Sequence, residues 1–326
     1  MIDTQAFRKA RFGVEGPAFA NFCALCKLGE LTLVTTTITR REIDAQIDEV
    51  APEFRSILAK AGGIAASLGQ SQIVVFGFPS TQLTELQVAV ALKKSVGEFF
   101  EKCGAEQLDL PKLALPKVLD LYFEKRPPFG PGKKKAEFPD ALVIEALKAK
   151  AGVNNQVIYV VSEDSDFANA CKECPHLELV PTLGHFLDHY NSHAESVKRI
   201  RATLRKNSRK IDERLDEIVN SLSGELDCPG SVKIAYRKIV DILDSLIISC
   251  DEARASVEFV CFVEIDAWLE ILPPNAAPPE YRHSEKQQAI NVTLEFRFDP
   301  SDATVFEVES YWAPQAISFS AQSASY

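Results

Sequence analysis

VIYVVSEDSDF, residues 157–167, is the stretch of sequence that decides the fold. Its first five residues form a continuous apolar run, which predicts a buried strand of a parallel sheet. The polar and acidic residues that follow, 162–166, predict the turn in which this strand ends. Because ligands of open α/β sheets bind beyond the carboxyl ends of the strands, this turn is also the first place to expect a functional site.

Around this strand, short apolar runs alternate with helical patterns up to about residue 186. The alternation predicts an α/β domain in which helices flank a parallel sheet. The predicted helices cover residues 18–28, 40–68, 81–102, 111–125 and 139–150. The predicted strands cover residues 31–37, 73–78, 157–161 and 177–180.

The pattern changes after about residue 181. A polar, highly charged helix is predicted over residues 195–221, and an amphipathic helix over residues 232–248. Antiparallel strands, with a turn at residues 299–302, are predicted over residues 256–271, 289–298 and 304–312. We therefore expect an α/β domain over residues 1–186, a charged helical connector over 187–225, and a smaller α+β accessory domain with an antiparallel sheet over 226–326.

The composition is that of an ordinary globular protein, with 46% hydrophobic and 25% charged residues. The net charge of −10 argues against a protein that coats nucleic acid by bulk electrostatics, but it leaves room for a cation-binding enzyme. No apolar run reaches the roughly 20 residues needed to cross a bilayer. The N-terminus lacks a cationic region followed by an apolar stretch, so we expect a cytoplasmic protein without a secretory signal.

The eight cysteines are expected to be free thiols that act as small hydrophobic residues. Cys23-x-x-Cys26 and Cys171-x-x-Cys174 together would supply the four thiolates of a zinc site. Both pairs stand in helical patterns with apolar neighbours, which favours core cysteines one turn apart. Three histidines recur every four residues, and we favour surface or structural roles for them: His185, His189 and His193.

Carboxylates stand at four places where strands end or helices begin: Asp3, Glu42, the Glu137–Asp140 turn and the Asp164–Asp166 turn. We expect these places to converge at one edge of the sheet. Carboxylates that converge without lysine or arginine partners repel one another and raise one another's pKa values. A divalent cation relieves this repulsion, and an all-oxygen set of ligands suits Mg²⁺ or Mn²⁺.

Each acidic residue also has an ordinary structural interpretation. Residues 39–42 fit a capping box, in which Glu42 only satisfies a backbone N–H. Asp140 is favoured near a helix start by the helix dipole whatever its role. Asp164 and Asp166 fit a simple polar turn after a strand. The order of all four places along the chain, rather than any single position, favours the functional interpretation.

That order resembles the PIN-domain nuclease family. Ile2-Asp3-Thr4 resembles the first motif of that family, a hydrophobic residue followed by Asp-Thr, and Thr39-Arg40-Arg41-Glu42 resembles its strand-to-helix glutamate. Residues 160–167 closely match its Ser/Thr-x-Asp-x-Asp-Phe element. RPPFG at 126–130 and KKKAEFPDA at 133–141 resemble a bacterial subgroup of PIN-like proteins of poorly defined role. The resemblance covers roughly residues 1–186.

The resemblance implies a nuclease that depends on Mg²⁺ or Mn²⁺ and hydrolyses phosphodiester bonds with a metal-activated water, most often in single-stranded RNA. Carried over by position, the implied metal ligands are Asp3, Glu42, Asp140 and Asp164. Asp166 would be a further catalytic residue, as a ligand or as a partner of one. Glu137 is a weaker candidate.

Basic segments are candidates for holding the polyanionic substrate. Arg126 and the three residues Lys133, Lys134 and Lys135 flank a Pro/Gly loop before the Glu137–Asp140 turn. Arg201 and Arg205 belong to a basic cluster in the charged helix. The alternatives are a solvated loop and a connecting helix whose charge is balanced by nearby acids. We expect an RNA substrate in preference to DNA, no membrane partner, and self-association or a partner protein at the C-terminal domain.

A rival interpretation is a non-catalytic nucleic-acid-binding or protein-binding module with the same fold. Only Met1 and Ile2 precede Asp3, so any strand that carries Asp3 is short. A short strand would hold the first carboxylate less rigidly, which favours the rival.

Overall fold

The computed structural model describes residues 1–70, 83–110, 114–126, 128–129, 137–154, 157–192, 195–226, 228, 230–251, 253–272, 278–298, 306–314 and 316–320. The chain divides into two compact units, Met1–Phe186 and Leu187–Tyr326. The division falls within helix α8 (Leu183–Asn191). Each unit has hydrophobic clusters of its own, and each is therefore described by itself.

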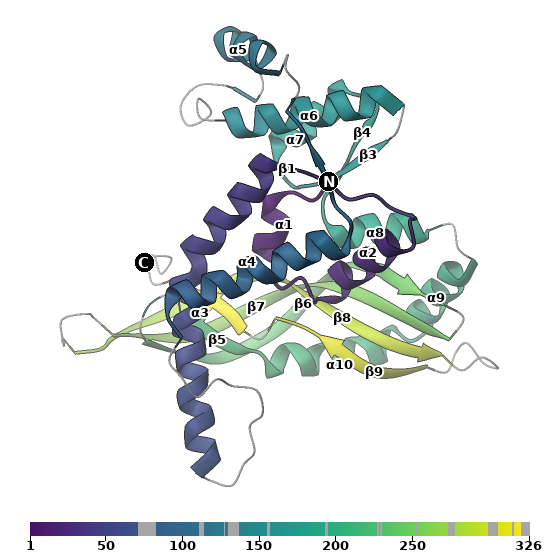
Figure 1. Ribbon diagram of the computed structural model, residues 1–326. Coiled ribbons are helices and arrows are strands. Elements are labelled where there is room, and N and C mark those ends of the chain that lie inside the picture. Colours follow the sequence, from purple (N-terminus) through teal and green to yellow (C-terminus); the bar gives the residue numbers. More distant parts are fainter. Residues whose placement is uncertain are drawn as a thin grey trace. The chain divides into compact units, whose positions relative to one another are not determined.

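The first unit consists of helices around two short parallel sheets (Figure 1). Its other helices are α1 (Thr4–Lys9), α2 (Pro17–Lys27), α3 (Thr37–Gln70), α4 (Glu85–Lys102), α5 (Ala114–Glu124), α6 (Phe138–Asn154) and α7 (Ser165–Glu173). Its strands are β1 (Val34–Thr36), β2 (Glu106–Leu108), β3 (Ile158–Val161) and β4 (Leu177–Val180). β1 pairs with β2 and β3 pairs with β4, both in parallel. The prediction of an α/β fold with parallel strands is confirmed.

The predicted helices of this unit correspond to α2 to α6, with ends that differ by a few residues. β1 is shorter than the predicted strand at 31–37, and β2 was not predicted because three residues carry too little pattern. The predicted strand at 73–78 lies outside the described residues. No helix among the described residues is both long and apolar enough to cross a membrane.

Strand β3 is the centre of one hydrophobic cluster of the first unit. Val160 on β3, Leu147 on α6 and Phe167 on α7 are almost completely buried in this cluster. The apolar run that predicted the strand is therefore explained by helices that cover it. A second group of aromatic side chains, Phe7, Phe19, Phe99 and Phe100, joins α1, α2 and α4 through ring contacts of 5.3 to 6.0 Å.

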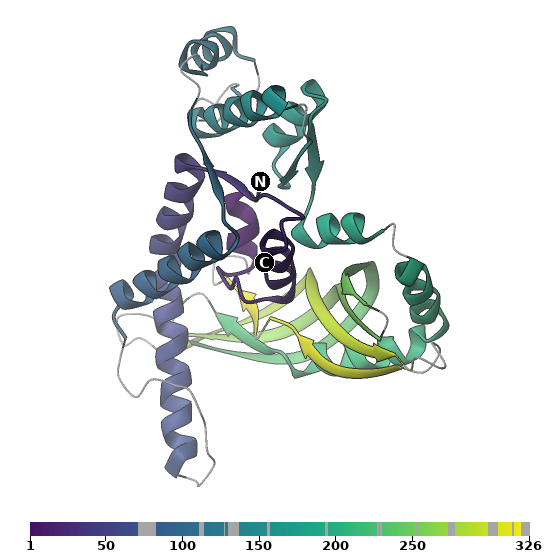
Figure 2. The ribbon, with the colours of Figure 1, turned by 45° about the vertical axis from the view of Figure 1, so that its right-hand side comes forward.

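The second unit contains a long, curved antiparallel sheet with the strand order β6-β7-β8-β9 (Figure 2). These strands are β6 (Gly230–Cys250), β7 (Arg254–Ile271), β8 (Glu280–Phe298) and β9 (Phe306–Trp312). β5 (Ser223–Leu226) and β10 (Ala316–Phe319) form a separate parallel pair. The antiparallel sheet confirms the fold predicted for the C-terminal part. The predicted turn at 299–302 lies outside the described residues.

The charged segment forms two helices, α9 (Glu195–Lys206) and α10 (Ser208–Ser221), rather than one. Their apolar residues, including Ile200 on α9 and Leu215 on α10, are buried in the same cluster as the inward side chains of the sheet. Both helices are thus amphipathic, with charged residues on the solvent side and an apolar stripe on the buried side. Both helices are part of the packed second unit.

The predicted amphipathic helix at 232–248 is wrong, because these residues lie in strand β6. Register shifts relative to β7 follow Ile234, Ile239, Ile242 and Ile247, and each gives β6 one extra residue. The half-buried positions of the strand, 232, 234, 237, 239 and 242, are consequently spaced by two or three residues. Residues on one face of a helix recur every three or four positions. A strand whose inward positions are two or three residues apart resembles this pattern, and for this reason residues 232–248 were predicted to be a helix.

Replacement of Leu215 by alanine tests whether the charged helices are part of the second unit. Leu215 is 0% exposed, so we expect the variant to lose about 2–5 kcal/mol of unfolding free energy. The control is Leu243→Ala, at a side chain that is 55% exposed. Chemical denaturation checks both. A Leu215→Ala variant as stable as the control would mean that α10 is a loosely attached connector.

Candidate metal centre

Asp3 is held against strand β3 by backbone hydrogen bonds. The amino group of Met1 donates to the Tyr159 carbonyl at 2.7 Å, and Val161 N donates to the Met1 carbonyl at 2.9 Å. Asp3 N donates to the Val161 carbonyl at 3.0 Å, and Ile2 forms a parallel bridge with Val161. The short segment is therefore a small parallel strand, and Asp3 at its end is 7% exposed.

The side chain of Ser162 connects Asp3 to the turn after β3. Ser162 Oγ donates to Asp3 Oδ2 at 2.7 Å and accepts from Asp164 N at 3.0 Å. Asp3 Oδ1 accepts from Thr4 N at 2.6 Å and caps α1, while Asp164 Oδ1 accepts from Asp166 N at 2.6 Å and caps α7. One hydroxyl thus joins the carboxylate of Asp3 to the backbone of Asp164, two residues that are far apart in the sequence. The sequence analysis did not single out Ser162 by itself, although it is part of the motif at 160–167.

Glu42 lies in the second turn of α3 and points back to the start of α1. The capping box that was the alternative interpretation of residues 39–42 is not formed, because Thr36 Oγ1, not Thr39, accepts the capping hydrogen bond, from Thr39 N at 3.1 Å. Glu42 is therefore not used as a cap. Its Oε2 instead accepts from Thr4 Oγ1 at 3.4 Å. Thr4 joins Glu42 to the segment that carries Asp3, which gives the threonine after Asp3 a positioning role.

Asp140 and Glu137 form a hydrogen-bonded carboxyl pair at the start of α6. The pKa of Asp140 is raised to about 8, first by burial and then by this hydrogen bond. The negative charges of Glu42, Glu137 and Asp164 raise it further. Burial and these negative charges therefore favour the protonated form of Asp140 in the metal-free protein.

The acidic residues act on one another throughout this group. Burial is the main cause of a raised pKa at both Asp3 and Glu42. The charge of Asp164 adds to the rise at Asp3, and the charges of Asp3 and Glu137 add to the rise at Glu42. Hydrogen bonds from Ser162 and Thr4 oppose the rise, but no cationic side chain of the described residues does. The structure thus brings the predicted carboxylates together.

We call Asp3, Glu42, Glu137, Asp140 and Asp164 the acidic cluster. Among the described residues, none of its members forms an ion pair with lysine or arginine. In the same part of the chain, no three of its members have oxygens that all lie within 4.8 Å of one another. The carboxylates therefore lie near one another, but their oxygens do not converge on a single point. The donors are all oxygens, which fits a hard divalent cation such as Mg²⁺ or Mn²⁺.

Asp166 differs from the other predicted ligands. Its side chain is 6% exposed and lines a shallow hollow together with Glu145, Lys148 and Asn169, which the acidic cluster does not line. The backbone of Asp166, by contrast, does contact the acidic cluster, because its N–H donates a hydrogen bond to the carboxylate of Asp164. Its metal-binding role stays a prediction.

The predicted nucleic-acid-binding residues have different surroundings. Arg126 is exposed and forms an ion pair with Glu124 at 2.6 Å. Lys133, Lys134 and Lys135 lie outside the described residues. In the second unit, Arg201 donates to both carboxylate oxygens of Asp188 at 2.7 Å, and Arg205 is an exposed residue of α9.

Asp188 Oδ1 also accepts from Ile247 N at 2.8 Å, so Arg201 supports an internal contact between α8 and β6. A guanidinium engaged in this way has fewer donors left for a phosphate. Arg205 is the better placed of the two for the predicted role, which stays a prediction for both.

The cysteines and histidines supply no second set of ligands in this unit. Cys23 and Cys26 are buried beside Cys103, whose thiol hydrogen-bonds with theirs. Cys171 and Cys174 pack against the cluster around β3 instead. The two Cys-x-x-Cys pairs thus contact different parts of the core. His185 Nδ1 is 2.8 Å from Thr182 Oγ1 at the start of α8, and His193 lies outside the described residues.

The fold and the acidic cluster define an α/β protein with a carboxylate-rich site at the ends of its parallel strands. Comparison with protein families agrees with this description, because a model described as PIN domain matches residues 1–167. The chain belongs to the PIN-domain family, a family of metal-dependent nucleases. The resemblance that the motifs indicated is confirmed. No curated protein and no solved structure matches the chain.

Asp140→Asn tests whether burial and the neighbouring carboxylates raise the pKa of Asp140 in the metal-free protein. The folded-state pKa of Asp140 is about 8, against an ordinary value of 3.8. The folded state therefore binds this proton more tightly than the unfolded state does. The contribution of the protonated group to stability is complete below about pH 4 and is lost as the pH rises to about 8.

The melting temperature of the wild type in EDTA should consequently fall, relative to that of Asp140→Asn, as the pH rises through this range. Added Mg²⁺ should remove the difference by neutralising the cluster. Melting temperatures of the two proteins that stay parallel at every pH would contradict the raised pKa.

Proposed function

We propose that this protein is a divalent-metal-dependent nuclease that hydrolyses phosphodiester bonds, with single-stranded RNA as its preferred substrate. The observation that carries the proposal is the acidic cluster, in which one buried and four half-buried carboxylates from distant parts of the chain act on one another without a cationic partner among the described residues. Membership of the PIN-domain family supports the reaction class. The preference for RNA rests on the family alone.

Four residues would hold Mg²⁺ or Mn²⁺: Asp3, Glu42, Asp140 and Asp164. A divalent ion bound there supplies Lewis acidity toward a phosphate oxygen and lowers the pKa of a water molecule. An ion bound there would favour the deprotonated form of Asp140, whose pKa is raised in the metal-free protein. Ser162 and Thr4 keep Asp3, Asp164 and Glu42 in place during this change.

The net charge of −10 means that the substrate is not held by the bulk charge of the protein. A polyanionic substrate is attracted here only when the cluster carries its cations and a local basic residue assists. Arg126, in the same unit as the cluster, is a described candidate for this assistance, and the role of Arg205 in the second unit stays a separate prediction. The proposal therefore includes a strict metal dependence of binding as well as of cleavage.

Asp164→Asn and Asp3→Asn test the assignment of the ligands. Each substitution removes a carboxylate charge but keeps the shape of the side chain. We expect turnover of labelled single-stranded RNA in Mn²⁺ to fall at least about a hundredfold, because an ion of this kind contributes several kcal/mol to the barrier. Asp44→Asn, on an exposed residue of the same helix as Glu42, is the control and should keep full activity.

Circular dichroism and melting temperatures establish that each variant is folded. Cleavage that survives EDTA, or that persists in Asp164→Asn, would contradict the proposal. RNA or DNA bound in stoichiometric amounts without cleavage in any metal would support the rival, a non-catalytic binding module.

Ser162→Ala tests the positioning role of the hydroxyl that joins Asp3 to Asp164. The variant keeps every carboxylate, so substrate affinity at saturating Mn²⁺ should change little. Loss of a hydrogen bond that orients a ligand typically costs about ten- to a hundredfold in metal affinity or activity. We expect kcat to fall within this range, with partial recovery at high Mn²⁺. Ser165→Ala, on an exposed neighbour in the same turn, serves as the control, and equal activities of the two variants would exclude the role.

A further inference from the structure

A second group of metal-binding side chains lies on the antiparallel sheet of the second unit. Asp266 on β7 is paired directly with Glu285 on β8, and Trp268 is paired with His283. Side chains alternate between the faces of a strand, so residues 266 and 268 share a face with residues 283 and 285. This face is the one turned away from the hydrophobic core, because Ile265, Ala267 and Leu269 are the buried residues of β7 here.

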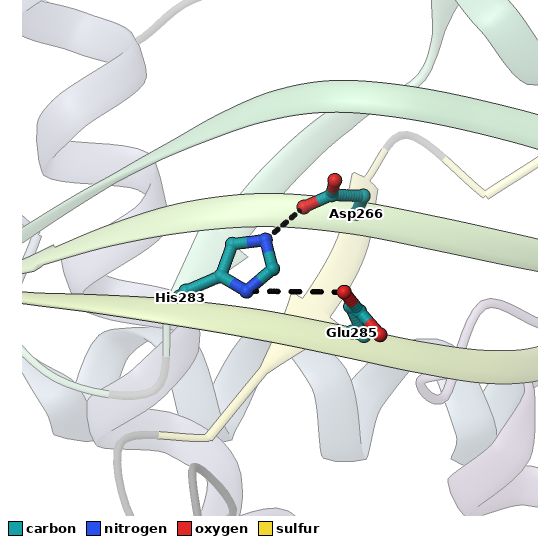
Figure 3. Close-up of side chains that lie close together, drawn as sticks. All are labelled: Asp266, His283 and Glu285. Atoms are coloured by element: carbon teal, nitrogen blue, oxygen red, sulfur yellow. Dashed lines mark hydrogen bonds and ion pairs between the residues drawn. The ribbon is translucent and has the colours of Figure 1, made fainter.

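The imidazole of His283 lies between the two carboxylates (Figure 3). His283 Nε2 is 2.5 Å from Asp266 Oδ1, and His283 Nδ1 is 4.0 Å from Glu285 Oε1. One ligand atom from each of the three residues can be chosen so that all lie within 4.8 Å of one another. In the described part of the chain, this is the one group of three with that property. Because the two carboxylates contact different ring nitrogens of His283, binding of one ion by all three residues requires one carboxylate to rotate toward the nitrogen that binds the metal.

The pairing of Asp266 with Glu285 places two negative charges opposite each other in the ladder, which is unfavourable without a cation. Their ion pairs among the described residues are with His283 alone. The nearby Glu270 does not take part, because it accepts from Ser231 Oγ at 2.8 Å and from Tyr281 Oη at 3.1 Å. A metal ion bound by the imidazole and the two carboxylates would relieve this conflict.

The surroundings hold the imidazole in place but leave the group open to solvent. The ring of Trp268 lies 4.8 Å from the ring of His283, between centroids, and restricts its rotation. The side chains of Asp266 and His283 are 37% and 38% exposed, and that of Glu285 is 77% exposed. β9 pairs with β8 only at residues 293–298 in the described sheet, so no strand flanks Glu285 on that side. An ion and its remaining water ligands have access.

We propose that Asp266, His283 and Glu285 bind a transition-metal ion of the Zn²⁺ class and thereby join β7 to β8. One imidazole nitrogen with two carboxylate oxygens is a donor set that suits Zn²⁺ and its first-row neighbours. Mg²⁺ prefers oxygen donors and water, so it suits the acidic cluster and not this site. The two sites therefore select different metals, and the proposal does not depend on nuclease activity.

Equilibrium dialysis of the full-length protein against Zn²⁺ tests the proposal. To remove the contribution of the acidic cluster, wild type and His283→Ala are each compared in an Asp164→Asn background as well. We expect His283→Ala to lose one equivalent of bound Zn²⁺ in both backgrounds, and an excess of Mg²⁺ should not displace it. His176→Ala, in the other unit, is the matched control and should bind as much Zn²⁺ as its parent.

Tryptophan fluorescence gives an independent local readout. Co²⁺ bound by His283 should quench the emission of Trp268, and Trp268→Phe should abolish this quenching because only Trp312 then remains. The half-saturating Co²⁺ concentration should rise about tenfold or more in His283→Ala, since even partners of metal ligands affect affinity by 10–100-fold. Zn²⁺ binding and quenching that are unchanged in His283→Ala, or reduced equally in His176→Ala, would overturn the proposal.

Discussion

Mutual repulsion among buried carboxylates is the constraint on which the site of this protein depends. Asp3, Glu42, Asp140 and Asp164 come from four separate places in the chain. Backbone N–H groups or hydroxyls hold Asp3, Glu42 and Asp164, whereas Asp140 is hydrogen-bonded to Glu137, and none of these carboxylates is paired with a described lysine or arginine. Burial and like charge raise the pKa values of Asp3, Glu42 and Asp140. Repulsion among these carboxylates lowers the stability of the metal-free fold, and a divalent ion bound by the acidic cluster would relieve it.

The architecture of the first unit follows from this requirement. Strand β3 ends in the turn that carries Asp164, and the segment before α1 pairs with β3 so that Asp3 ends at the same edge. The starts of α3 and α6 bring Glu42 and the Glu137–Asp140 pair to this edge. Ser162 and Thr4 then replace the salt bridges that would normally fix such side chains. Hydroxyls can do so without neutralising the charge.

Much of this site could be predicted from the sequence, because its signals are local. The apolar run at 157–161 and the acidic turn after it are sufficient to place Asp164, and the motif order adds Asp3, Glu42 and Asp140. The hydroxyl partners depend on which side chains meet across the fold, a contact that no local pattern encodes. The cap of α3 was assigned three residues too late because several threonines precede the helix and any of them can cap it.

The second unit contains features that the periodicity of the sequence did not predict. In β6 the register shifts alter the spacing of apolar residues, so periodicity indicated a helix where the structure has a strand. The polar surface of α9 and α10 likewise suggested a connector, although their apolar stripe is buried with the sheet. The group of Asp266, His283 and Glu285 could not be predicted, because it exists only through the pairing of β7 with β8.

The most direct test of the central claim is a crystal structure of the protein with Mn²⁺, in which anomalous scattering locates the metal. We predict a strong anomalous peak in contact with carboxylate oxygens of Asp3, Asp140 and Asp164, with Glu42 close by. A structure in which these oxygens stay apart, or in which lysine or arginine side chains neutralise them and no peak appears among them, would contradict the account.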